Sequence, residues 1–193
     1  MEKLFYFDVE TTGLDPVKNG IHQISGFIEI DSQFKQDFNF VVAPYKTDII
    51  EKTALDVAGV TEEHIKGYPP IEIIYTQLIS VLDNYVDKFD KRDKYFLVGY
   101  NNAHFDNQFL RSWFDKNNDR YFGSWFWSNS IDVMVLASEF LKNKRAGMKD
   151  FKLKTVAVEM GIEIDETQLH NALYDVHLTR QIYKIITNKN GKQ

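Results

Sequence analysis

Four acidic residues fall where the surrounding pattern predicts a buried face, and a titratable histidine, His170, lies five residues before the last of them. The acids are Asp8, Glu10, Asp106 and Asp175. Buried acids need a compensating charge, and no Lys or Arg shares those faces. Divalent cations held by oxygen ligands would supply it, so these residues predict metal-assisted hydrolysis of a phosphoester. The alternative is that each acid is a hydrogen-bonded core or capping group.

The first two acids lie on one predicted strand, residues 3–10. Side chains alternate between the faces of a strand, so Asp8 and Glu10 point the same way as Tyr6. The sequence Thr-Thr-Gly at 11–13 then ends the strand and puts both acids at its C-terminal end. Open α/β sheets bind their ligands outside this end of the strands.

The other two acids lie on predicted helices. Asp106 begins a helix whose apolar stripe follows at i+3, i+4 and i+7. Asp175 lies in a last helical segment over 170–187, with apolar residues at i−3, i+7 and i+11. Three segments that are far apart in the sequence are therefore expected to point acidic side chains toward the same part of the protein interior.

The composition predicts one folded domain over residues 1–193 and excludes several classes of protein. Hydrophobic residues make up 44% and aromatic residues 15%, which is enough for a sizeable core. The absence of cysteine excludes disulfides and thiolate metal sites, and no apolar run reaches the ~20 residues of a membrane helix. The start has no signal-peptide pattern, so we expect a cytoplasmic protein. The net charge of −5 argues against a protein that coats duplex DNA.

Hydrophobic periodicity predicts three sequential strands followed by alternating strands and helices. The predicted strands, the long helix, the short strand and the strand-to-helix region lie at 3–10, 21–30, 34–42, 71–86, 95–98 and 131–141. This order predicts an α/β fold with a mixed five-stranded sheet, three antiparallel and then parallel strands, flanked by helices. Its layout resembles a ribonuclease H-like fold.

Three segments resemble the motifs of the DEDD 3′-to-5′ exonucleases in the same order and spacing. They are Phe-Asp-Val-Glu-Thr-Thr-Gly-Leu at 7–14, Gly-Tyr-Asn-Asn-Ala-His-Phe-Asp at 99–106 and His-Asn-Ala-Leu-Tyr-Asp at 170–175. The third has the histidine of the DEDDh, or DnaQ-like, form. The second motif and the Trp-Phe-Trp segment at 125–127 are most similar to the nuclease domain of the exonuclease I group. Three ordered motifs are far more specific than any one of them.

The resemblance implies a two-metal site. Asp8 would bridge two Mg²⁺ ions, for which Mn²⁺ can substitute. Glu10 and Asp175 would complete the shell of one ion, and Asp106 would hold the other. His170 would deprotonate the attacking water. The expected activity is 3′-to-5′ hydrolysis of single-stranded DNA with release of nucleoside 5′-monophosphates.

The loop after the strand acids is expected to contact the terminal nucleotide. Together with two residues of the second motif, the candidate substrate-binding residues are Thr11, Thr12, Gly13, Leu14, Asn101 and Asn102. Leu14 would lie against the last base, and Thr12 or its backbone N–H would lie near the 3′-hydroxyl. The alternative for the loop is an ordinary turn. Asn101 and Asn102 either line the path of the strand or satisfy backbone groups in their own turn.

Two further segments each allow two interpretations. The aromatic run at 121–127 either stacks bases or packs into a core or an interface. The basic run at 142–154 is either a solvated loop or an edge that follows phosphates.

The sequence leaves alternative functions open. The same chemistry directed at RNA would give an RNA-trimming exoribonuclease, because nothing in Thr12 or Leu14 decides whether a 2′-hydroxyl is admitted. A proofreading subunit would need a polymerase, but only residues 188–193 follow the predicted last helix, so we expect no partnership through a tail. A non-catalytic accessory domain would not need all five candidate catalytic groups. The sequence is compatible with a monomer or a homodimer.

Overall fold

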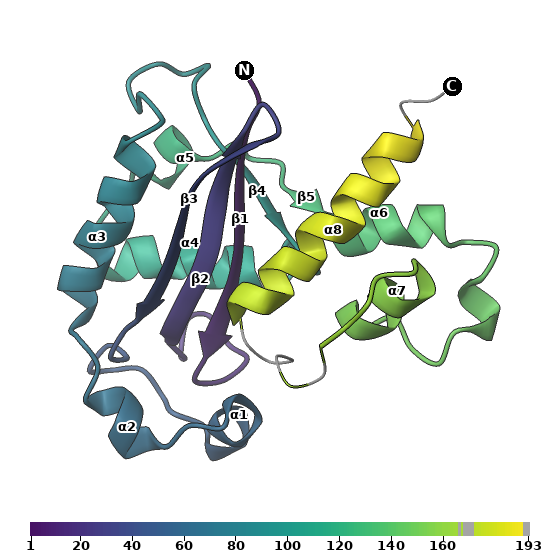
Figure 1. Ribbon diagram of the computed structural model, residues 1–193. Coiled ribbons are helices and arrows are strands. Elements are labelled where there is room, and N and C mark those ends of the chain that lie inside the picture. Colours follow the sequence, from purple (N-terminus) through teal and green to yellow (C-terminus); the bar gives the residue numbers. More distant parts are fainter. Residues whose placement is uncertain (166, 168–171, 191–193) are drawn as a thin grey trace.

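A computed structural model describes residues 1–165, 167 and 172–190, and its central feature is one five-stranded mixed sheet (Figure 1). The strand order is β3-β2-β1-β4-β5. The strands are β1 (Lys3–Thr11), β2 (Ile21–Ile30), β3 (Gln33–Val41), β4 (Phe96–Gly99) and β5 (Ile131–Asp132). The first three pair antiparallel, while β4 runs parallel to β1 and β5 parallel to β4. The predicted fold class is confirmed.

Helices cover both faces of this sheet. The helices are α1 (Lys52–Ala58), α2 (Glu62–Lys66), α3 (Ile71–Asp83), α4 (Asp106–Lys116), α5 (Phe122–Trp125), α6 (Val133–Phe140), the 3₁₀ turn Arg145–Gly147, α7 (Leu153–Glu159) and α8 (Ala172–Asn190). Helix α3 ends at Asp83, before the predicted end at residue 86. Val86 is buried although it lies in the loop that follows the helix. Apolar periodicity therefore continued past the end of the helix.

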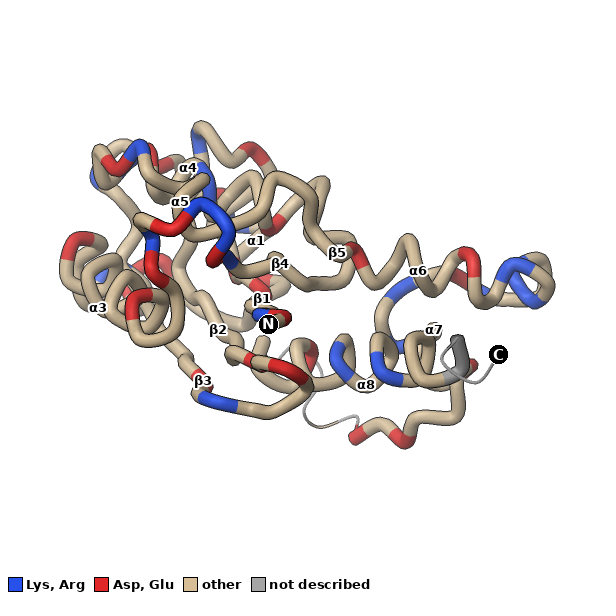
Figure 2. The backbone as a smooth tube through the Cα atoms, turned by 90° about the horizontal axis from the view of Figure 1, so that it is seen from above, with Lys and Arg blue, Asp and Glu red and all other residues tan. Residues whose placement is uncertain are grey.

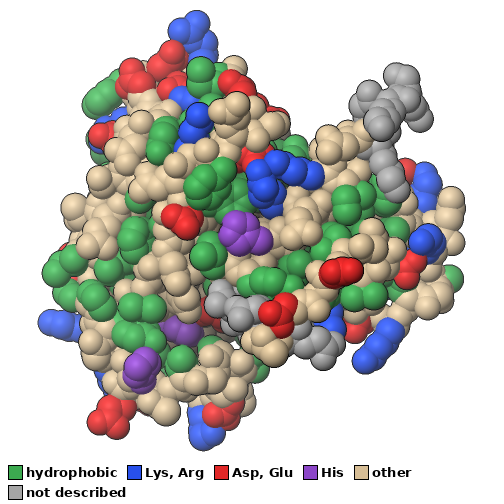
Figure 3. Space-filling model, viewed as in Figure 1, with side chains coloured by type: hydrophobic (Ala, Val, Ile, Leu, Met, Phe, Trp, Pro, Cys, Tyr) green, Lys and Arg blue, Asp and Glu red, His purple; other side chains and the backbone are tan. Residues whose placement is uncertain are grey.

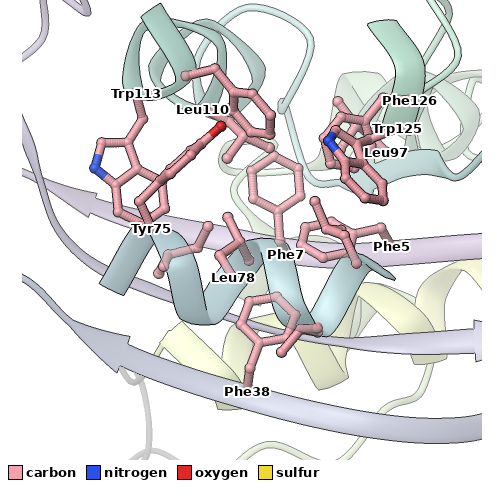
Figure 4. Close-up of a cluster of buried hydrophobic side chains, with 14 of the residues drawn as sticks. Phe5, Phe7, Phe38, Tyr75, Leu78, Leu97, Leu110, Trp113, Trp125 and Phe126 are labelled. Carbon is pink, nitrogen blue, oxygen red and sulfur yellow. The ribbon is translucent and has the colours of Figure 1, made fainter. Parts of the chain in front are cut away.

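The alternation of β1 divides the core into two halves. Phe5 and Phe7 point into a hydrophobic cluster that is closed by α3, α4 and α5. Figure 4 shows side chains of this cluster, many of them aromatic. Leu4 and Tyr6 point into the opposite cluster, closed by α6, α7 and α8. Most of the aromatic run at 121–127 packs into the first cluster, which supports the packing interpretation of that segment.

A buried ion cluster fastens α8 to the sheet. Glu29 on β2 is 2% exposed, and its Oε2 accepts a hydrogen bond from Arg180 Nε at 2.6 Å. Lys184 Nζ lies 3.3 Å from the same oxygen. Both cations are on α8, so the cluster fixes the helix that carries Asp175 against the strand beside β1.

Truncating the acid of this cluster should destabilise the domain. Glu29→Ala leaves two cations near a buried site without their partner, which costs about 3 kcal/mol. Urea denaturation of the variant should show the loss, whereas Glu139→Ala, which breaks an exposed pair with Lys142, should change stability by less than about 1 kcal/mol. Equal effects of the two changes would show that the cluster does not anchor α8.

Charges of both signs are spread over the surface. The view from above shows basic and acidic positions interleaved along the chain, and the face in Figure 3 carries no extensive patch of one sign (Figures 2 and 3). In the basic run, Lys142 pairs with Glu139 and Lys144 with Glu159. Within the described residues, no helix is long and apolar enough to cross a membrane.

Candidate active site

Two acids of the first motif extend beyond the end of a neighbouring strand. The pairing of β1 with β4 runs from Leu4 opposite Phe96 to Tyr6 opposite Val98. Asp8 and Glu10 follow on β1, past this paired stretch and on the face of Tyr6. Their position is the predicted C-terminal end of the strand.

The acid of the second motif reaches the same point from the other side. Asp106 is the first residue of α4 and is 5% exposed. Its Oδ1 accepts a hydrogen bond of 3.1 Å from the backbone N–H of Val9, between the two acids of the first motif. The contact spans 97 residues of sequence and occurs where β4 no longer pairs with β1.

The third motif approaches along α8. This helix begins beside the C-terminal end of β1 (Figure 1). Asp175 lies in its first turn, half-buried, and its charge acts on both Asp8 and Glu10. His170 lies outside the described residues, so its predicted role stays a prediction.

Burial and neighbouring carboxylates raise the pKa of three of these acids. Burial raises the pKa of Asp8 well above its usual value, and Asp106, Glu10 and Asp175 add to the effect. Burial, with Asp175 and Asp106, raises the pKa of Glu10 to about 7. The pKa of Asp106 is also raised to about 7, chiefly by burial, against the lowering effect of its backbone hydrogen bonds. The three motifs therefore meet in one strongly acidic centre.

This centre has the chemistry of a site for a hard divalent cation. All its candidate ligands are carboxylate oxygens, the donors that Mg²⁺ and Mn²⁺ prefer. A bound cation would lower the pKa values that burial and mutual repulsion have raised. Among the described side chains, no three acid or histidine groups are close enough together to hold one ion as they stand.

The raised pKa values predict how the stability of the metal-free domain depends on pH. A raised carboxyl pKa means that the folded protein holds the proton more tightly than the unfolded chain. The resulting contribution to the free energy of unfolding is fully present below pH 4, near the pKa values of these groups in the unfolded chain. It is lost as the pH rises to about 7, the pKa value in the folded protein. In EDTA, wild type should lose on the order of 2–4 kcal/mol between pH 4.5 and 8, relative to the double variant Glu10→Gln/Asp106→Asn. Urea denaturation checks this, and a difference that stays constant with pH would contradict it.

The hydrogen-bonding groups of Thr12 are engaged within the loop, and its predicted contact with the 3′-hydroxyl stays a prediction. Its hydroxyl donates to the carbonyl of Ile49 at 2.8 Å and accepts from the N–H of Gly20 at 2.9 Å. Its own N–H donates to the carbonyl of Gly20. Thr11 is similarly engaged, since its hydroxyl donates to the carbonyl of Gly13. Both threonines therefore close the loop on itself, as the turn interpretation expected.

Gly13 and Leu14 differ in what they leave open to substrate. A Cβ at Gly13 would lie 2.3 Å from the amide nitrogen of Asn19, so this glycine allows two segments of the loop to pack closely. Leu14 is 78% exposed, as a side chain that lies against a base would have to be. Leu14 is the residue of this loop that we retain as a substrate contact.

The two asparagines of the second motif have different environments. Asn102 is fully buried, and its amide N–H donates to Asn107 Oδ1 at 3.2 Å. Its side chain therefore joins the loop to the first turn of α4. Asn101 is partly exposed and has a φ of +63°, which is uncommon for any residue except glycine.

Asp132 is a buried acid beside this site that was not among the predicted residues. Asp132 is 8% exposed and accepts hydrogen bonds from three backbone N–H groups. Its charge also raises the pKa of Asp106. The signal that could have revealed it was an acid within the apolar run 131–136, which is the signal that identified the other four.

Residues 5–183 match the sequence model of a family described as RNase T, exonuclease. The chain belongs to this exonuclease family. The predicted DnaQ-like 3′-to-5′ exonuclease family is thereby confirmed, and so is the assignment of the chain to the exonucleases as a class of enzyme. Exonucleases of this family depend on metal ions.

Relatives of this exonuclease domain include enzymes named for DNA and for RNA. It is 27% identical over 176 residues to the PolC-type DNA polymerase III of Thermotoga petrophila, covering 91% of this chain and 11% of the polymerase. It is 28% identical over 198 residues to ribonuclease T of Wigglesworthia glossinidia brevipalpis, covering 94% of this chain and 83% of the relative. The domain thus corresponds to about a tenth of the polymerase and to most of the ribonuclease.

Solved structures of E. coli exonuclease I share the fold. The complex of that enzyme with a dT13 oligonucleotide superimposes with a TM-score of 0.76 at 19% identity, over 96% of this chain and 41% of exonuclease I. A further structure of the same enzyme with single-stranded DNA contains bound zinc and has a TM-score of 0.77 at 19% identity, over 100% of this chain and 42% of exonuclease I.

Proposed function

We propose that this domain removes nucleotides from the 3′ end of single-stranded DNA by hydrolysis that depends on Mg²⁺. The observation that carries the proposal is that acids from three separate motifs lie near one another at the end of β1, where Asp106 and Asp175 raise the pKa values of Asp8 and Glu10. A binding module would gain nothing from this arrangement, because four neighbouring carboxylates repel a phosphate backbone unless cations lie between them.

Each catalytic group has one role in the proposed reaction. His170 accepts a proton from water as the oxygen attacks the phosphorus of the terminal nucleotide. The bond from phosphorus to the 3′-oxygen of the preceding nucleotide then breaks, which releases a nucleoside 5′-monophosphate and leaves a new 3′-hydroxyl. Asp8, Glu10, Asp106 and Asp175 would hold two Mg²⁺ ions, with Mn²⁺ as a substitute. When bound, these ions would stabilise charge on the attacking and leaving oxygens.

Exposed Leu14 supports action at a strand end. Its side chain is exposed in the turn that follows the acids, where it would be free to lie against a base. The interspersed surface charges also suit a short contact with a strand end better than an extended grip on a duplex. Neither feature requires a second copy of the chain.

The relatives favour DNA over RNA without excluding the ribonuclease alternative. PolC-type polymerases and exonuclease I are named for DNA, and ribonuclease T for RNA. A polymerase partner, as the PolC relatives would suggest for a proofreading domain, is the second alternative. Both alternatives predict the same centre and differ in the substrate or in the need for another protein.

One gel separates these alternatives. Single-stranded DNA and RNA oligonucleotides of matched sequence, labelled at the 5′ end, are incubated with the protein and Mg²⁺, Mn²⁺ or EDTA. We expect a ladder that shortens from the 3′ end, forms faster on DNA and is absent in EDTA. A 3′-phosphorylated DNA serves as a blocked control.

Each other outcome has a defined meaning. A faster ladder on RNA would replace the DNA proposal with the exoribonuclease. Intact oligonucleotides with both metals would contradict a self-sufficient nuclease and favour the accessory or polymerase-dependent role. Shortening from the 5′ end would contradict the proposed polarity.

A further inference from the structure

Asp132 lies where the edge strand of the sheet ends and a helix begins. It is the last residue of β5 and caps α6, and it pairs in parallel register with Gly99, the last residue of β4. The loop 100–105, which leads to Asp106, begins at that point. Asp132 is thus beside the start of the loop that carries the second motif.

The carboxylate of Asp132 makes more contacts than a helix cap requires. Its Oδ1 accepts from the N–H of Met134, which is the cap of α6, and from the N–H of Asn101, each at 3.0 Å. Its Oδ2 accepts from the N–H of Ala103 at 3.4 Å. A serine or threonine hydroxyl would be sufficient for the cap. The other two contacts, from Asn101 to Oδ1 and from Ala103 to Oδ2, hold the loop.

The loop held in this way determines where α4 starts. Asn101 has a positive φ, which asparagine adopts more readily than most other non-glycine residues, and its N–H donates to Asp132. The carbonyl of Asn102 accepts from the N–H of Asn107 at 2.9 Å, in the first turn of α4. A Cβ at Gly99 would lie 2.6 Å from the Cβ of Asn102, so the loop is folded tightly onto β4. Asp106 lies between the loop and this turn, and its side chain reaches Val9.

We propose that Asp132 is a positioning residue for Asp106. It touches neither substrate nor metal, and it acts by fixing the backbone of the loop 100–105, so that the carboxylate of Asp106 is delivered to the end of β1. The activity readout of the proposal rests on the proposed nuclease function, while the metal-binding readout does not.

The test uses a variant that keeps the cap and removes the contacts to the loop. In Asp132→Ser the hydroxyl can still accept from Met134, but it is too short to reach Asn101 and Ala103 as well. We expect kcat on a single-stranded oligonucleotide to fall about 10- to 100-fold with little change in KM, as for outer residues that orient metal ligands. The rise in melting temperature caused by added Mn²⁺ should fall to less than half of its wild-type size.

The matched control is Asp119→Ser. Asp119 also accepts from a backbone N–H at the start of a helix, that of Tyr121 before α5, and from the hydroxyl of Tyr75, and neither of these partners belongs to the loop 100–105. Its change should leave kcat and the effect of Mn²⁺ as in wild type. A second variant, Asp132→Asn, keeps one oxygen for Asn101 and Met134 and turns an N–H toward that of Ala103, so it should show a smaller loss of the same kind.

The outcomes distinguish the two proposals. A wild-type kcat and a wild-type Mn²⁺ response in Asp132→Ser, with only the loss of melting temperature seen in Asp119→Ser, would show a simple cap and overturn the positioning role. If Asp132→Ser does not fold, Asp132→Asn decides by the same two readouts, and failure of both to fold would assign Asp132 to stability alone. If wild type does not cut DNA or RNA, the nuclease proposal fails, and the Mn²⁺ response still tests the positioning of Asp106.

Discussion

Replacing Asp8 by asparagine should abolish hydrolysis at every Mg²⁺ concentration and should also raise the melting temperature of the metal-free protein. Activity is lost because both ions of the proposed site would lose the ligand that they share, and we expect a fall of at least about 10³-fold in kcat. Stability rises because burial and three negative neighbours disfavour the charged form of this side chain. An amide of the same shape removes that unfavourable charge.

The size of the stabilisation can be set in advance. Removing a buried charge whose pKa is strongly raised should contribute about 1–2 kcal/mol at pH 7.5, or roughly 2–8 °C for a domain of this size. Melting curves in EDTA and in Mg²⁺ check it, with Asp56→Asn as the control, because Asp56 forms an exposed pair with Lys52. Added Mg²⁺ should stabilise wild type and leave Asp8→Asn almost unchanged. Residual turnover near that of wild type would refute the shared-ligand role of Asp8.

Replacing His170 by alanine should slow the chemical step and spare the binding of the strand. Loss of a positioned general base lowers kcat by about 10²–10⁴-fold. Single-turnover kinetics with saturating protein measure that step, and fluorescence anisotropy with a labelled oligonucleotide in Ca²⁺ measures binding. Raising the pH should recover part of the lost rate, because hydroxide then replaces water deprotonated by the side chain.

The matched control for this prediction is His64→Ala. His64 is an exposed histidine of α2 whose ring packs against Tyr68, so its loss should alter neither readout. A fall in affinity of His170→Ala with an unchanged single-turnover rate would make His170 a contact to the strand instead of a base.

Local signals in the sequence were sufficient to predict the positions of Asp8, Glu10 and Asp106 on their strand and helix, and the arrangement of the strands. The period of two in residues 3–10 placed Asp8 and Glu10 on the face of Tyr6, and the structure places them there. The helical stripe after Asp106 predicted a helix starting with this residue, and α4 does. These predictions succeeded because the periodicity of apolar side chains reflects the local backbone geometry directly.

Predictions of the contacts that polar groups make with a substrate stay predictions. Thr12 is within the first motif, and its hydroxyl and N–H are hydrogen-bonded to Gly20 and Ile49. Asn102 is buried and donates to Asn107 of α4. A sequence shows which residues carry hydrogen-bonding groups, whereas the fold of the loop decides which of these groups remain free for a substrate.

By itself, the sequence predicted the chemistry proposed for this protein, which uses four carboxylates and a histidine, and it determined the order of segments that form a mixed sheet with helices on both faces. Only the tertiary structure decided how these groups are held. Asp106 reaches the backbone of Val9, Asp132 holds the loop before Asp106, and Glu29 receives cations from α8. The reason is that hydrophobic periodicity depends on residues a few positions apart, whereas the partner of a buried polar group is set by the packing of segments far apart in the chain.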